Sequence, residues 1–112
     1  MKIAFPTNDG VKIASHFRRS SEFKIFDIES KRILKTEIRP TGFIQPYSNP
    51  ADKKSSREHH QIQKEIINVI EDCDRVMVNK IRKRHLSMLV AQHTVVDITR
   101  EKYINEAIKY YL

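Results

Sequence analysis

The apolar residues of this chain change their spacing part-way along the sequence, and this change constrains the fold more than any other feature. Before residue 40 the apolar runs are short, rich in β-branched and aromatic side chains, and separated by turn residues, which is typical of strands. After residue 54, short apolar runs alternate with segments whose apolar residues recur every three or four positions. The pattern predicts three strands, then helices alternating with two further strands.

The first part of the chain predicts a meander of strands followed by a loop. The expected strands cover residues 2–5, 22–29 and 32–39, and the last two are expected to form a hairpin across a polar turn. Residues 41–54 hold two prolines and a glycine and show no strand or helix periodicity. We therefore expect one long loop there, of a length that is often functional.

The second part predicts three helices and two strands. The first helix is expected to begin in a capping-box sequence, with Ser55 three residues before Glu58. Strands are expected at residues 75–79 and 94–98, a helix at 81–91, and a last helix with Thr99 as its N-cap. The predicted inner faces of the three helices are, in order, Ile62, Ile66, Ile67 and Ile70; Leu86, Leu89 and Val90; and Tyr103, Ile104, Ala107, Ile108 and Tyr111.

The order β-β-β-α-β-α-β-α restricts the topology. Right-handed crossovers make the fourth and fifth strands parallel to the first. The natural sheet order is 3-2-1-4-5, with only strand 2 antiparallel to its neighbours. This is a three-layer α/β arrangement with the ribonuclease-H-like layout, and residues 1–112 are expected to form a single domain.

The charge of the chain is strongly positive. Twenty-one Lys and Arg residues against fourteen Asp and Glu give a formal charge of +7, which attracts nucleic acid, acidic lipid, phosphorylated metabolites or an anionic metal cluster without choosing among them. No apolar run approaches the ~18–20 residues of a membrane span. The single cysteine, Cys73, excludes an internal disulfide, which favours a reducing compartment. Together with the short apolar runs, this predicts a cytoplasmic protein with no membrane partner.

The topology is expected to gather basic residues at one end of the sheet. The segments that leave strands 1 and 4 diverge there, at the kind of switch point where open α/β sheets bind ligands. The first turn of a helix adds free N–H groups and the positive end of its dipole. The residues that we expect at this anion site are His16, Arg18, Arg19, Asn79, Lys80 and Arg82.

Several segments resemble a known family. Residues 1–10 (MKIAFPTNDG), Ser15-His16-Phe17, residues 23–28 (FKIFDI) and residues 106–112 (EAIKYYL) are similar to the dinitrogenase iron–molybdenum cofactor-biosynthesis family. The specific part is Pro-Thr-x-x-Gly followed by Ser-x-Phe around His16. The resemblance implies a small ribonuclease-H-like domain and, as candidate ligands, an iron–sulfur or iron–molybdenum cluster. It also implies that His16 is a cluster ligand or contact, and it suggests cofactor-assembly proteins as partners.

The chain departs from this family where the family carries glycines. The family usually has glycine after His-Phe, where this chain has Arg18, and a Gly-Gly-x-Gly loop after the fourth strand, where it has residues 79–82 (NKIR). Glycines allow a ligand to approach the backbone closely, so long cationic side chains should narrow the pocket. Side-chain contacts could replace the lost backbone contacts, or ligand binding could have been lost.

Two functions follow. The first is a non-enzymatic binding or carrier protein for an anionic metal cluster or small anion. The alternative is a nucleic-acid or protein-interaction module that has lost the cluster site. Nucleic acid is the less favoured partner, since no aromatic stacking residues interleave the basic sets.

Enzymatic chemistry is not expected. Two-metal phosphoryl transfer needs clustered carboxylates, and only Asp9 lies near the predicted pole, where a turn role is typical. His59 and His60 diverge on a helix and cannot easily chelate one metal. His85 is expected at the edge of the core, and Cys73 at the opposite pole from His16.

Overall fold

The computed structural model describes residues 1–41 and 66–112. Within them the strands form one five-stranded sheet in the order β3-β2-β1-β4-β5. The elements are β1 (Lys2–Thr7), η1 (Phe17–Arg19), β2 (Glu22–Glu29), β3 (Arg32–Pro40), β4 (Arg75–Val78), α2 (Lys83–Ala91), β5 (Val95–Ile98), α3 (Ile104–Ala107) and η2 (Ile108–Tyr111).

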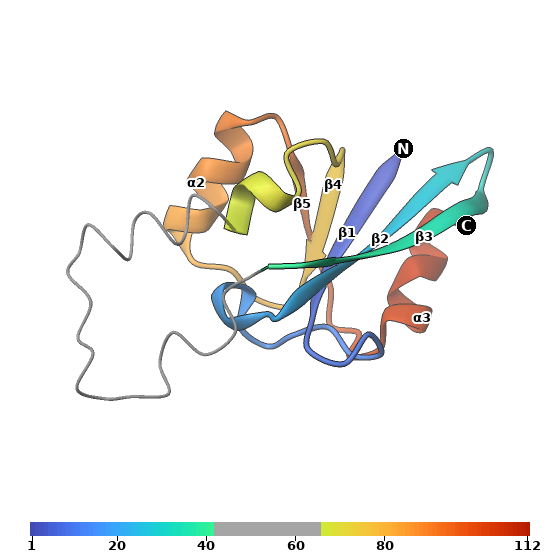
Figure 1. Cartoon of the computed structure of the whole chain (residues 1–112), viewed down its shortest axis with the longest axis horizontal. Helices are drawn as coiled ribbons and strands as arrows, with labels where there is room; N and C mark the ends of the chain where they lie inside the picture. Colours follow the sequence, from blue (N-terminus) through green and yellow to red (C-terminus); the bar gives the residue numbers. More distant parts are fainter. Residues whose placement is uncertain (42–65) are drawn as a thin grey trace.

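The sheet confirms the predicted topology. β2 pairs antiparallel with both β1 and β3, whereas β4 pairs parallel with β1 and β5. Figure 1 shows α2 and α3 on opposite sides of the sheet, as in a three-layer fold. The carboxyl ends of β1 and β4 therefore lie side by side and carry the segments that form the candidate site.

Each face of the sheet has its own core, because alternate residues of a strand point to opposite faces. On one face Ala4, Val76 and Val78 pack with Leu89 of α2 and with residues 66, 67 and 70, of which 66–69 are helical. On the other face Ile3, Phe5 and Met77 pack beneath α3 and η2. Phe5 meets Phe26 edge-on, with the ring centroids 5.6 Å apart.

The last helix begins later than predicted. Thr99 is not its N-cap: α3 starts at Ile104 after Tyr103. Residues 99–103 instead lie beside the segment that follows β1, where the N–H of Ile13 donates to the carbonyl of Lys102 at 2.8 Å and the N–H of Ile104 donates to the carbonyl of Val11 at 2.9 Å. The Thr99 hydroxyl accepts from the N–H of Glu101 and so closes a turn. Tyr103, predicted inside, is 47% exposed.

The inner face of α2 also differs from the prediction. Leu89 is buried as expected, but Leu86 and Val90 are exposed and His85 takes the inner position. His85 is 3% exposed and its ring lies 5.5 Å from that of Phe17. An imidazole therefore packs where the apolar pattern predicts an aliphatic side chain.

Some predictions lie outside the described residues. These are the loop beyond Thr41, the capping box of Ser55 and Glu58, and the burial of Ile62. Among the described residues, no helix is long and apolar enough to cross a membrane.

Candidate functional site

The turn after β1 is organised by Asp9. Its carboxylate oxygen Oδ1 accepts hydrogen bonds from the backbone N–H groups of Val11 and Lys12, both at 2.8 Å. These backbone bonds hold the pKa of Asp9 below its ordinary value. Gly10 completes the turn with a φ of +76°, a conformation that other residues rarely adopt. Asp9 thus has the structural role that its place after a strand predicts.

The short helical turn η1 carries the first part of the site. Phe17 anchors this turn in the core. The residue is 3% exposed, and its ring centroid lies 5.7 Å from that of Phe23. The hydroxyl of Ser20 donates to the carbonyl of Phe17 at 2.8 Å and closes the turn. The flanking side chains of His16 and Arg19 are left exposed at the carboxyl end of β1.

The segment after β4 carries the second part. Asn79 fixes its start, since its Nδ2 donates to the carbonyls of Thr99 at 2.9 Å and Glu101 at 2.7 Å. Lys80 and Arg82 follow and are exposed. Arg82 is the N-cap of α2 but makes no side-chain capping bond.

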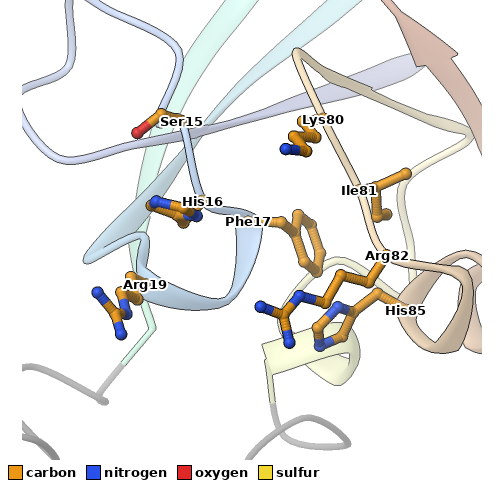
Figure 2. A pocket seen from close by; sticks show the side chains of 8 residues that line it. All are labelled: Ser15, His16, Phe17, Arg19, Lys80, Ile81, Arg82 and His85. Carbon is orange, nitrogen blue, oxygen red and sulfur yellow. The ribbon is translucent and has the colours of Figure 1, made fainter.

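These two segments enclose a cavity of about 200 Å³. Figure 2 shows the ring of Phe17 between the side that carries His16 and Arg19 and the side that carries Lys80 and Arg82. The lining residues are Ser15, His16, Phe17, Arg19, Lys80, Ile81, Arg82 and His85. None of them is acidic and three are Lys or Arg, so the described lining is cationic.

The predicted site residues divide into three groups. His16, Arg19, Lys80 and Arg82 line this one cavity. Asn79 instead lines a neighbouring cavity, with both N–H donors of its amide directed to backbone carbonyls. Arg18 is the middle residue of η1, and the contribution of its side chain stays a prediction.

Four lining residues lie outside the predicted set, namely Ser15, Phe17, Ile81 and His85. Of these, His85 has the least expected place. It lies three residues after Arg82, in the first turn of α2, and is buried against Phe17. The sequence placed it at the edge of the core. One indication of its place in the cavity was available in the sequence: His85 is the third residue of the helix that directly follows Lys80 and Arg82.

The donor set limits what the cavity can hold. Among residues 1–41 and 66–112, no group of three His, Cys, Asp or Glu side chains could hold a metal ion. Cys73 lies near the start of β1, where the N–H of its neighbour Asp74 donates to the carbonyl of Lys2, far along the sheet from His16. The described residues thus offer positive charge and an exposed imidazole rather than a complete metal-binding set.

Comparison with known proteins decides the family. The family model described as dinitrogenase iron-molybdenum cofactor matches residues 1–112. The chain belongs to this family. A comparison with curated proteins found no match.

Solved structures share the fold of this family member. The protein PH0822 is 21% identical with a TM-score of 0.76, and the match covers 99% of this chain and 88% of that one. A NifB-like protein from Thermotoga is 15% identical with a TM-score of 0.69, covering 98% and 85%. The apo orange protein from Desulfovibrio gigas is 14% identical with a TM-score of 0.67, also covering 98% and 85%.

The family name implies an association with an iron–molybdenum cofactor, and the cavity can be tested for its fit. Its cationic lining suits an anionic group. Its volume of about 200 Å³ is below the ~300–1,000 Å³ of pockets that enclose a drug-sized ligand. The cavity therefore has the charge and the size to accept a small anion, or one edge of a larger cluster.

Proposed function

We propose that this family member is a non-enzymatic binding protein that holds an anionic metal cluster or a small anion in the cavity between η1 and residues 80–82. Arg19, Lys80 and Arg82 would neutralise the ligand through charge-assisted hydrogen bonds. His16 would supply a metal ligand or a further hydrogen bond. Support for the proposal comes from the electrostatics of one helix end.

The start of α2 carries the proposal. The helix has Arg82 as its N-cap, Lys83 and Arg84 as its next residues, and no acidic residue in its first turn. The N-terminus of a helix already bears about +0.5 charge from its dipole, and cations placed there destabilise the helix. A bound anion would compensate both the dipole and the side chains, and free N–H groups would hydrogen-bond to it.

The size of the cavity indicates how a ligand would bind. The buried ring of Phe17 is part of its lining, and Lys80 and Arg82 lie across that ring from His16 and Arg19. A cluster larger than the cavity would rest on the rim with one face between the cations. Contacts through long side chains would then take the place of the backbone contacts that the family's glycines allow.

Two probes test this function. Molybdate should raise the midpoint temperature of thermal unfolding, since it binds only the folded chain. Under anaerobic conditions, iron with sulfide should give a charge-transfer absorbance. The double variant Lys80→Ala/Arg82→Ala should lose the thermal shift, and His16→Ala should reduce the absorbance. A matched control, Lys31→Ala/Arg32→Ala, removes the same charge at the β2–β3 turn and should behave as the parent. No shift and no absorbance would overturn the proposal.

Replacement of the family's glycines also favours a second function, an interaction module for nucleic acid on the same basic surface. Phe17 is buried, so the described lining residues include no exposed Phe, Tyr or Trp on which a base could stack. Titrating single-stranded and duplex nucleic acid at several salt concentrations separates the two functions. Affinity that falls steeply with salt and is lost in the Lys80→Ala/Arg82→Ala variant would favour this second function.

A further inference from the structure

The edge strand β3 is unusually open. It is nine residues long and has β2 on one side only. Within the described residues no strand pairs with its other side, and all its residues except Glu37 and Arg39 are exposed. A long edge strand of this kind presents unpaired N–H and C=O groups to another chain.

The two faces of β3 differ in chemistry. Thr36 and Ile38 pair with Phe26 and Lys24 of β2 and so share the face covered by α3. Lys35 and Glu37 lie on the opposite face, paired with Asp27 and Ile25. The α3 face of this strand is therefore mainly apolar, and its opposite face is charged.

The apolar row on β3 is not covered. Ile38 is 45% exposed and Ile33 is 41% exposed, although their paired neighbours on β2 belong to or border the buried core. Leu34 is 60% exposed and lies at the register shift opposite Asp27 and Ile28. Three aliphatic side chains on one edge strand thus face solvent beside a buried core.

We propose that β3 binds β3 of a second copy in an antiparallel pair centred on Thr36. A two-fold axis at Thr36 places Lys35 opposite the partner copy's Glu37, and this pair occurs twice. The same axis places Leu34 opposite Ile38, also twice, so these aliphatic side chains meet each other. In this register, opposite charges and aliphatic side chains therefore meet at four positions around the axis.

Neighbouring registers do not have this property. A two-fold axis at Lys35 places two Lys35 side chains opposite each other, and an axis at Glu37 does the same for two carboxylates. Like charges directly opposite destabilise a strand pair. Lys35 makes no ion pair among the described residues, so its charge is available for the partner copy's Glu37.

The strand also limits the strength of the pair. Glu37 already contacts Arg39 at 3.1 Å, and the register shift beside Leu34 bends the end of the ladder. Pairing of one strand per copy is small beside a standard interface. We therefore expect a weak dimer whose population rises with protein concentration.

Charge exchange tests the register. Sedimentation equilibrium of the full chain should show a concentration-dependent dimer. Lys35→Glu turns two attractive pairs into repulsive ones and should raise the dissociation constant by about tenfold. The double variant Lys35→Glu/Glu37→Lys restores opposite charges and should recover dimerisation. Arg84→Glu makes the same charge change on α2 and should leave it unaltered, with circular dichroism confirming that every variant folds.

Cross-linking tests the contact directly. Cys73 is buried, so Thr36→Cys adds one accessible thiol on the proposed axis. Mild oxidation should convert this variant into a disulfide-linked dimer, whereas Lys109→Cys, on η2, should stay monomeric. A constant monomer mass at all concentrations would overturn the proposal. Equal cross-linking of both variants, or a dimer that the double charge variant does not recover, would overturn it too.

Discussion

The guanidinium of Arg39 on β3 holds the carboxylate of Asp72, which precedes β4, by two hydrogen bonds of 2.5 and 2.9 Å. The same guanidinium donates to the carbonyl of Val69 at 3.0 Å. One side chain thus fastens the edge of the sheet to the segment that leads into its centre. Because Asp72 is nearly half exposed, solvent screens much of this interaction.

Replacing Arg39 should therefore cost a modest amount of stability. We expect Arg39→Ala to lower the free energy of unfolding by about 1 kcal/mol, measured by urea denaturation. Arg32→Ala, on the same strand and without an ion pair among the described residues, is the matched control and should change little. Equal effects of the two substitutions would contradict the role of the contact.

The contact between Arg39 and Asp72 also predicts that the stability of the fold decreases at low pH. The hydrogen bond from Arg39, with help from Lys2, holds the pKa of Asp72 well below its usual range. As pH falls, Asp72 therefore takes up a proton in the unfolded chain at a higher pH than in the folded chain. The stabilisation is present above the unfolded pKa of about 4 and is lost as pH falls below it. Asp72→Asn should remove this part of the acid dependence, so its difference in stability from the parent should shrink between neutral and acidic pH.

A contact at the β5 edge of the sheet predicts that the stability of the fold decreases at high pH. The hydroxyl of Tyr111 donates to Asp97, which also accepts from Arg75 at 3.1 Å. Burial, followed by Asp97, raises the pKa of Tyr111. Tyr111 therefore loses its phenol proton at a lower pH in the unfolded chain than in the folded chain. The stability of the fold consequently decreases as pH rises above about 10.

Tyr111→Phe isolates this effect. We expect it to lower the free energy of unfolding by about 1 kcal/mol at neutral pH. It should also reduce the alkaline loss of stability relative to the parent, as measured by urea titration at several pH values. Tyr110→Phe is the control, since Tyr110 is 73% exposed and should alter neither quantity.

Strand order and the meeting of distant segments could be predicted because they depend on local pattern and chain connectivity. The predicted boundaries of β2 are those observed. Right-handed crossovers then bring Lys80 and Arg82 to the carboxyl end of β1, where His16 and Arg19 lie.

The predictions that were wrong, for Thr99 and for the inner face of α2, failed because of contacts between residues far apart in the sequence. Thr99 has the sequence of an N-cap, but residues 11–13 and the amide of Asn79 bind the backbone of residues 99–104 and delay the helix. His85 replaces an aliphatic residue on the inner face of α2 because the ring of Phe17, far away in sequence, offers it an aromatic contact. Such pairings depend on the fold, and in the local sequence only the place of His85 near the start of its helix points to one of them.

The thiol of Cys73 should be unreactive in the folded chain. Burial raises its pKa to about 12, and the thiolate is the reactive form. We expect labelling by a thiol reagent to be slow in buffer and fast in concentrated urea. Rapid labelling without urea would contradict the burial of Cys73, and an introduced Lys109→Cys gives the rate of an exposed thiol for comparison.

The last prediction concerns the positively charged N-terminus of α2. Lys83 is the first residue of a helix that has no acid in its first turn, so its charge opposes the helix dipole. Lys83→Glu should raise the free energy of unfolding of the ligand-free chain by about 0.5 kcal/mol, and Lys83→Gln should raise it by less. The same substitution should weaken the thermal shift produced by molybdate, since it adds a negative charge beside the cavity. A variant that gains stability and keeps the full shift would place the anion away from this helix end.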